Sequence, residues 1–277
     1  MYFYKGSNGE KMKKSIISIL LILIMLIYPT VNGLEMYSTR QTDVRTETDT
    51  ELLSELSQGK VDTVRQNISA VQKELSDKQA ESQKQTEKKE LLDKLDKGEL
   101  SYRNLFKNVY IMGDSLMDGL VVYDILNSNS LITQVSASLY HLNDNIGKIT
   151  RINPEILILH YGLNHVEDVP QQPERFIKLY TKLVAELKEK LPGTRIIISG
   201  IFPVDADKAR AKRYGRIGDY NKAIEEMCSQ LGVEYLDNNP AFTDAKAYYS
   251  GDGIHLRGDF YEKCWLRHIV AEKEIYR

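Results

Sequence analysis

Hydrophobic residues are unevenly distributed along this chain and divide it into three regions. Residues 15–31 form an apolar run without a single charge, whereas charged and polar residues dominate 34–107. From residue 108 onward, short apolar runs alternate with amphipathic segments. We therefore predict a signal peptide or signal-anchor helix at 1–33, a polar spacer and helical stalk at 34–107, and a globular domain at 108–277.

The first region fits two kinds of targeting segment. Lys11, Lys13 and Lys14 precede the apolar run, as in a signal peptide, and 31–33 offers a cleavage site. The run is also close to the ~20 apolar residues of a membrane-spanning helix. In both cases the lysines stay in the cytoplasm and the rest of the chain is exported. We expect a single-pass anchor in the cell membrane with the globular domain outside, or else secretion after signal cleavage.

The second region begins with a threonine-rich, acidic stretch at 38–50, which is typical of a flexible spacer. Five apolar residues then alternate three and four positions apart, like the seam of a coiled coil: Val61, Val64, Ile68, Val71 and Leu75. Polar residues occupy the next positions in this register. The pattern fits a stalk that self-associates as a coiled coil, and equally a single solvated helix.

The third region alternates strand-like and helix-like segments. Strands are predicted at 109–112, 132–135, 155–160, 195–201 and 233–236. Helices are predicted at 116–126, 176–187, 220–231 and 259–277. This alternation predicts a parallel sheet with helices on both faces. In such sheets the chemistry lies beyond the carboxyl ends of the strands.

Polar residues follow two of these strands and recur near the C-terminus. Ser115 lies at a strand-to-helix turn, where its backbone N–H can face negative charge. Asn164 follows the third strand. Asp252 and His255 are three residues apart, so the carboxylate can orient the imidazole. Taken singly, each has a plainer interpretation as a helix cap or turn residue.

Taken together, Gly113-Asp114-Ser115, Asn164 and Asp252 with His255 resemble the SGNH, or GDSL-type, hydrolase family over residues 108–270. The resemblance implies an α/β fold, a three-layer α/β/α sandwich with a flavodoxin-like parallel sheet. It implies Ser115 as nucleophile, His255 as general base and Asp252 as its orienting partner. The implied oxyanion hole comprises Ser115, Ser136 and Asn164, and Gly162 and Ile254 are the expected substrate contacts.

Two residues depart from the family pattern. Ser136 stands where the family usually has glycine, which preserves a backbone N–H but changes the turn. His165 follows the asparagine where aspartate is common. These departures affect the expected rate and substrate more than the reaction class.

We expect an exported serine esterase that hydrolyses short O-acyl esters on cell-surface polysaccharide or peptidoglycan, or another small ester. The alternatives are an O-acyltransferase on envelope glycans, a lipid esterase and a non-catalytic binding module that retains the fold.

Composition and motifs also limit the binding partners and cofactors that we expect. The 37 basic and 39 acidic residues give a net charge of −2, which disfavours nucleic acid. No motif indicates a metal or a cofactor. Two cysteines, Cys228 and Cys264, would either pair or remain free. A basic segment at Arg210, Lys212, Arg213 and Arg216 is interpreted as a solvated loop, or else as an edge of the cleft facing an anionic polymer.

Overall fold

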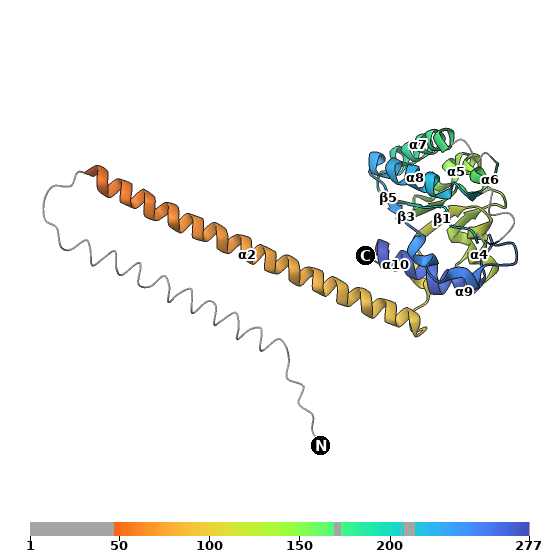
Figure 1. The fold of residues 1–277 in the computed structure, drawn as a ribbon, viewed down its shortest axis with the longest axis horizontal. Helices are drawn as coiled ribbons and strands as arrows, with labels where there is room; N and C mark the ends of the chain where they lie inside the picture. Colours follow the sequence, from red (N-terminus) through yellow and green to blue (C-terminus); the bar gives the residue numbers. More distant parts are fainter. Residues whose placement is uncertain (1–46, 169–172, 206, 208–213, 277) are drawn as a thin grey trace, which may run out of the picture. The chain divides into compact units, whose positions relative to one another are not determined.

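The computed structural model describes residues 47–168, 173–205, 207 and 214–276 (Figure 1). The predicted anchor at 1–33 lies outside these residues, as does most of the predicted spacer. Within the described part of the chain, no helix combines the length and the apolar character needed to cross a bilayer. The chain divides into two compact units, 1–77 and 78–277.

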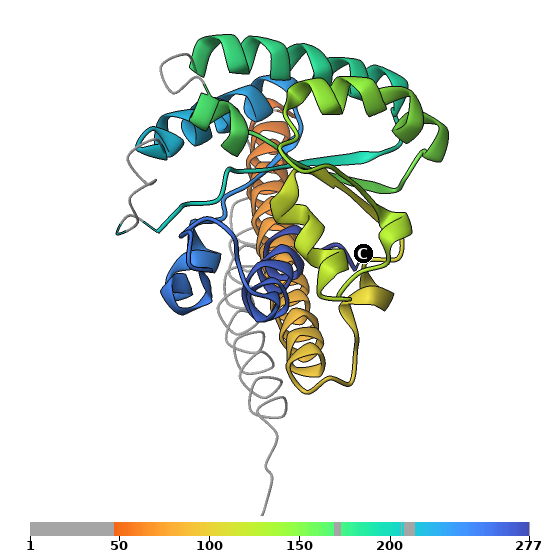
Figure 2. The same cartoon turned by 90° about the vertical axis from the view of Figure 1, so that its right-hand side faces the viewer.

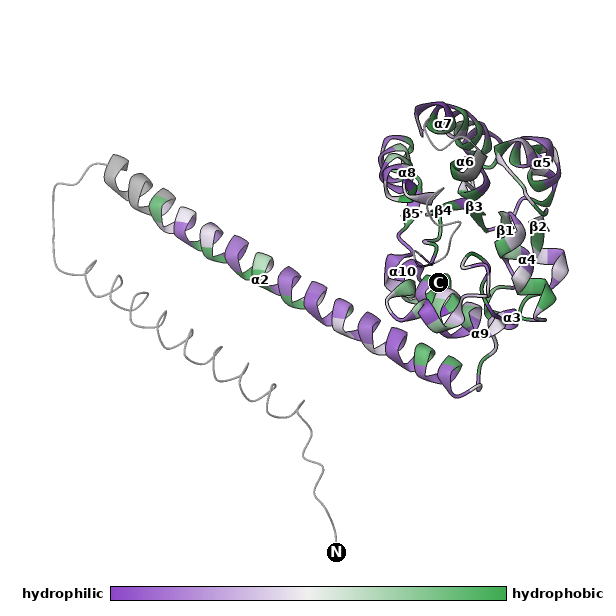
Figure 3. Cartoon of the chain, turned by 45° about the vertical axis from the view of Figure 1, so that its right-hand side comes forward, coloured by the Kyte–Doolittle hydropathy of each residue, from purple (hydrophilic) through white to green (hydrophobic). Residues whose placement is uncertain are grey.

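A single long helix, α2 (Glu47–Asp96), fills much of the predicted stalk. It begins inside the stretch predicted as a spacer, so the last residues of that stretch are helical rather than flexible. The five seam residues are 45–55% exposed along a largely hydrophilic helix (Figure 3). Association of this seam with a second chain stays a prediction.

The core of the second unit is a five-stranded parallel sheet with strand order β2-β1-β3-β4-β5, which confirms the predicted sheet. This order is that of flavodoxin-like folds. The strands are β1 (Val109–Gly113), β2 (Leu131–Thr133), β3 (Ile156–His160), β4 (Arg195–Ser199) and β5 (Glu234–Leu236). Every residue of β3 is buried, as its uninterrupted apolar run requires for a central strand covered on both sides.

Helices cover both faces of this sheet (Figures 2 and 3). One face carries α5 (Leu139–Ile152), α6 (Leu163–Asp168), α7 (Pro173–Lys190) and α8 (Ile217–Leu231). The other face carries α4 (Ser115–Val122), α9 (Gly258–Phe260), a π-helical turn (Tyr261–Leu266) and α10 (Arg267–Lys273). Short 3-10 helices lie at Ser128–Ser130, Asn239–Phe242 and Ala245–Tyr248.

Helix α5 was not among the predicted helices, although the sequence carries a signal for it. Ser138 caps its first turn by accepting from the N–H of Tyr140, and Leu139, Leu142 and Ile146 form a buried stripe. Helix α4 ends at Val122, four residues before the predicted end.

Residues before Asn108 also join the core. Leu95 near the end of α2, Tyr102 in α3 (Tyr102–Leu105) and Phe106 are all buried. The ion pair between Asp96 and Arg267 holds the end of α2 with N···O distances of 3.0 and 3.1 Å. Packing therefore begins before residue 108, where the globular domain was expected to start.

The two cysteines are free in the structure. Cys228 is buried on α8, and Cys264 is partly buried in the π-helical turn. Three residues of the basic segment, Arg210, Lys212 and Arg213, lie outside the described residues. Its fourth, Arg216, pairs with Asp219 at 2.8 Å.

Candidate active site

The turn after β1 places Ser115 at the first residue of α4. Asp114 caps this helix, since its Oδ1 accepts from the N–H of Leu116 at 3.0 Å. A side chain at Gly113 would meet Met117 at 2.5 Å and the carbonyl oxygen of His160 at 2.9 Å. The tight turn therefore requires glycine and directs the chain into the helix that begins with Ser115.

A short hairpin near the C-terminus carries the other two predicted triad residues. It is closed by a bridge between Tyr249 and Leu256, and by a 2.7 Å hydrogen bond from the N–H of Ser250 to the carbonyl of His255. Gly253 turns the chain with a φ of 71°. The hairpin presents the carboxylate of Asp252 and the ring of His255 on one side.

Three side chains form a continuous hydrogen-bonded chain at the edge of the sheet. Asp252 Oδ2 lies 2.6 Å from His255 Nδ1, and His255 Nε2 lies 3.2 Å from Ser115 Oγ. The side chain of His255 is 50% exposed and that of Asp252 is 35% exposed, so the site is open to a substrate. Their catalytic roles stay predictions, but their distances suit proton transfer from serine to histidine.

Asp252 is held in its ionised form. Partial burial alone would raise its pKa, but hydrogen bonds from the His255 ring and from the N–H groups of Ile254 and His255 outweigh burial and lower it. A carboxylate so fixed keeps the proton of the histidine on Nδ1 and leaves Nε2 to accept from serine.

Asn164 contacts the chain neighbours of the other two predicted oxyanion residues. Asn164 Nδ2 donates to the carbonyl of Ala137, next to Ser136, at 2.9 Å. The same nitrogen lies 3.4 Å from Asp114 Oδ2, next to Ser115. The first contact fixes the plane of the amide, and the second is longer than a typical N–H···O bond, so the hydrogen that faces Asp114 is only weakly engaged.

Ser136 has a φ of 55°, in the left-handed region that favours glycine. This backbone conformation accounts for the glycine that the family usually carries at the matching position. The other departure, His165, lies on α6 and packs its ring against Phe176 with centroids 5.0 Å apart. This contact packs α6, which carries Asn164, against α7.

The two predicted substrate contacts present little surface. Gly162 is buried, and a side chain there would meet Ile201 at 2.5 Å. Ile254 is 8% exposed and its N–H donates to Asp252 Oδ1. Both residues are part of the packed interior, and their contact with substrate stays a prediction.

Two functional supports escaped the sequence analysis. Asp114 is buried, and burial raises its pKa to about 7. Tyr261, in the π-helical turn, donates from its hydroxyl to the carbonyl of Leu116 at 2.5 Å. Gly119 makes room for this ring, because a side chain there would lie 2.6 Å from it. The C-terminal helices thus hold the first turn of α4.

Comparison with known proteins places this arrangement in a family. The model of the GDSL-like lipase/acylhydrolase family matches residues 111–263. Similar solved structures include a GDSL-like lipase from Bacteroides thetaiotaomicron, with 17% identity, a TM-score of 0.48, and 60% of this chain and 86% of that chain covered. An acetyl xylan esterase from Geobacillus stearothermophilus has 16% identity and a TM-score of 0.43, with 58% and 93% covered. A carbohydrate esterase family 3 protein from Talaromyces cellulolyticus has 16% identity and a TM-score of 0.45, with 60% and 95% covered.

No curated protein matches this chain. The family match spans more than half of the chain and contains Ser115, Asn164, Asp252 and His255. This chain belongs to the GDSL-like lipase/acylhydrolase family.

Proposed function

We propose that this protein is an exported serine esterase that removes short O-acyl groups, such as acetyl, from cell-surface polysaccharide or peptidoglycan. The observation that carries the proposal is the chain of hydrogen bonds from Asp252 through His255 to Ser115. The predicted N-terminal anchor supports placement outside the cell, where such esters occur.

The first half of the reaction acylates Ser115. His255 Nε2 takes the hydroxyl proton as Oγ attacks the carbonyl carbon of the ester, and the imidazolium is stabilised by Asp252. The negative oxygen that forms faces the N–H groups of Ser115 and Ser136 and the amide of Asn164. The intermediate collapses by breaking the bond to the alcohol oxygen, which leaves with the proton from His255.

The second half releases the acid. Water gives a proton to His255 Nε2 and adds to the acyl carbonyl carbon, and collapse breaks the bond to Oγ. His255 returns the proton to Ser115, so the enzyme is restored and a carboxylic acid departs. A sugar hydroxyl in place of this water would make the same site an acyltransferase.

Turnover of p-nitrophenyl acetate by the full chain tests the proposal. We expect hydrolysis by the wild type, loss of it in Ser115→Ala, and covalent labelling of Ser115 by a fluorophosphonate that is weakened in His255→Ala. Acetate release into water identifies a hydrolase, whereas acetate transfer to an added sugar identifies a transferase. Absence of serine-dependent turnover with p-nitrophenyl esters of every acyl length would reject the esterase.

A further inference from the structure

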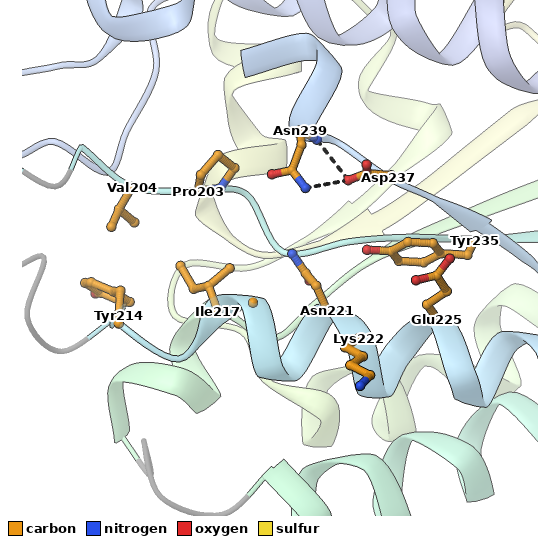
Figure 4. A pocket seen from close by; sticks show the side chains of 12 residues that line it. Pro203, Val204, Tyr214, Ile217, Asn221, Lys222, Glu225, Tyr235, Asp237 and Asn239 are labelled. Carbon is orange, nitrogen blue, oxygen red and sulfur yellow. Dashed lines mark hydrogen bonds between the residues drawn. The ribbon is translucent and has the colours of Figure 1, made fainter. Parts of the chain in front are cut away.

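A hollow opens at the same edge of the sheet as the predicted triad. It has a volume of about 500 Å³ and lies between α8 and the segments that follow β4 and β5. Figure 4 shows Val204 and Tyr214 toward one end, and Tyr235 and Glu225 toward the other. No residue of the triad lines it.

The wall of this hollow is tied to the hairpin that carries Asp252 and His255. Pro203, in the wall, accepts a hydrogen bond from the hydroxyl of Tyr249 at 2.8 Å. Two residues later, the N–H of Asp205 donates to the carbonyl of Gly253 at 2.8 Å. Two hydrogen bonds therefore join the segment that lines the hollow to the hairpin of Asp252 and His255.

Strand order sets the separation between the two sites. Ser115 follows β1, and the hollow lies beyond β4 and β5, two to three strands away in the order β1-β3-β4-β5. Neighbouring strands are ~4.8 Å apart, which gives a separation on the order of 10–15 Å. A short oligosaccharide spans this distance while it presents an acylated hydroxyl to Ser115.

The lining suits a neutral ligand rich in hydroxyl groups. Lys222 contributes one positive charge, and Glu225 and Asp237 contribute two negative charges, so a strongly anionic polymer gains little. The partly exposed ring of Tyr235 adds apolar surface of the kind on which the C–H faces of sugars pack. Tyr214 is 3% exposed and closes the wall of the hollow without offering a free ring face.

The floor of the hollow is already ordered. The amide of Asn221 accepts from the N–H of Ile201 at 2.7 Å and donates to the carbonyl of the same residue at 2.9 Å. These bonds fix α8 to the segment after β4, so a ligand meets a preformed surface.

We propose that this hollow is a glycan subsite that binds sugar units of a neutral, O-acylated polysaccharide while a neighbouring unit carries the ester to Ser115. The proposal names the substrate class of the esterase described above and rests on that function. It places specificity for the polymer in α8 and the segments after β4 and β5, apart from the residues that break the ester bond.

Gly218 provides the sharpest variant. It lines the hollow on α8, and a Cβ there would meet no atom within 4 Å, so there is room for the start of a larger side chain. We expect Gly218→Trp in the full chain to raise KM by about 10-fold for acetylated xylo-oligosaccharides, with little change in kcat. Kinetics with p-nitrophenyl acetate should match the wild type.

Glu225→Ala removes one polar partner and should raise the same KM by about 3-fold to 10-fold. Glu226 gives the matched control, since it is exposed on the same helix but does not line the hollow. Glu226→Trp and Glu226→Ala should leave KM for both kinds of substrate unchanged. O-acetylated peptidoglycan fragments carry carboxylates and test the preference for a neutral polymer, so their KM should not change in Gly218→Trp.

A binding experiment separates the subsite proposal from the esterase proposal. Calorimetry measures the binding of the same oligosaccharides, after deacetylation, to the Ser115→Ala variant. Binding that Gly218→Trp weakens supports the subsite even if no ester is hydrolysed, in which case the esterase proposal alone fails. The subsite is overturned if the xylo-oligosaccharides do not bind, or if Gly218→Trp and Glu226→Trp have equal effects on binding and on KM.

Discussion

Ser115 and Ser199 each lie within hydrogen-bond distance of a histidine ring at the carboxyl edge of the sheet. Ser115 Oγ is 3.2 Å from His255 Nε2, and Ser199 Oγ is 3.1 Å from His160 Nδ1. The two distances are nearly equal, so the pairs differ in their burial and in their other hydrogen-bond partners.

His255 is half-exposed and bonded to the carboxylate of Asp252, whereas His160 is fully buried against Phe202 with ring centroids 4.2 Å apart. Burial lowers the pKa of His160 to about 3, so its ring stays neutral. Ser199 also accepts from Asn238 at 2.9 Å. The buried, neutral ring of His160 can therefore only connect β3 to β4 through its hydrogen bond with Ser199. The ring of His255 is half-exposed and bonded to a carboxylate, so it can act as a base.

The largest expected difference between the pairs is in activity. His255→Ala should lower kcat for p-nitrophenyl acetate by about 10⁴-fold to 10⁶-fold with little change in stability, because the base is lost from an exposed position. Ser199→Ala should retain activity but lose about 1–3 kcal/mol of unfolding free energy, because buried partners lose a hydrogen bond. Kinetics and urea unfolding of both variants measure this. Equal loss of activity in both would contradict the distinction.

The second difference between the two serine–histidine pairs is the carboxylate of Asp252, which is bonded to the ring of His255. Asp252→Asn should lower kcat by about 10³-fold to 10⁴-fold, because an amide N–H facing Nδ1 favours the wrong tautomer of His255. Asp259→Asn is the control, since this acid pairs with Arg257 outside the triad. Similar rates for the two variants would show that Asp252 does not orient the base.

Asp114 provides a test of burial beside the nucleophile. Its pKa is raised to about 7 in the folded protein, so between about pH 4 and pH 7 the folded state keeps a proton that the unfolded chain releases. The wild type therefore loses stability as pH rises through this window, and the loss is complete above it. Asp114→Asn lacks this titration but keeps an oxygen for the N–H of Leu116.

We therefore expect the variant to gain up to about 4 kcal/mol over the wild type between pH 4 and pH 7. His160 changes stability in the opposite direction, because the unfolded chain protonates its ring below the ordinary histidine pKa. That contribution is common to both proteins and cancels in the difference. A difference that does not change with pH, in urea unfolding, would place the pKa of Asp114 near its usual value.

The smallest expected effect concerns the left-handed backbone of Ser136. Ser136→Gly should stabilise the protein by about 0.5–1 kcal/mol, because glycine adopts this φ without a steric penalty. Activity should stay within about twofold, since the expected oxyanion donor is a backbone N–H. Val135→Gly in the same turn gains nothing from this effect, because Val135 is outside the left-handed region. A lower Tm for Ser136→Gly than for Val135→Gly would contradict the strain.

Patterns within a few residues of sequence predicted the elements that depend on those residues alone. The apolar runs at β1, β3 and β4 gave strands within two residues of their ends, because central parallel strands need continuous apolar residues. The three-residue spacing of Asp252 and His255 likewise predicted their contact. Helix α5 was missed although its apolar stripe and its cap are both local signals.

The buried network around His160 could not be predicted in this way. His160, Ser199, Asn238 and Trp265 come from four separate segments, and the Trp265 Nε1–Asn238 Oδ1 bond of 3.0 Å forms only when these pack together. The position of Ser115 near His255 depends in the same way on the sheet order. Their pairing came from resemblance and from the rule for parallel sheets, not from spacing.

Ser115 and His255, the proposed nucleophile and base, are 140 positions apart, and the ring of Tyr261 that supports the first turn of α4 comes later still. Because a ribosome releases the chain from its N-terminus, Ser115 emerges long before His255 and Tyr261. A nascent chain, or one truncated before residue 250, holds Ser115 without its proposed base. If Ser115 and His255 act together as proposed, such a chain is expected to be silent toward esters until its final segment is synthesised and folded.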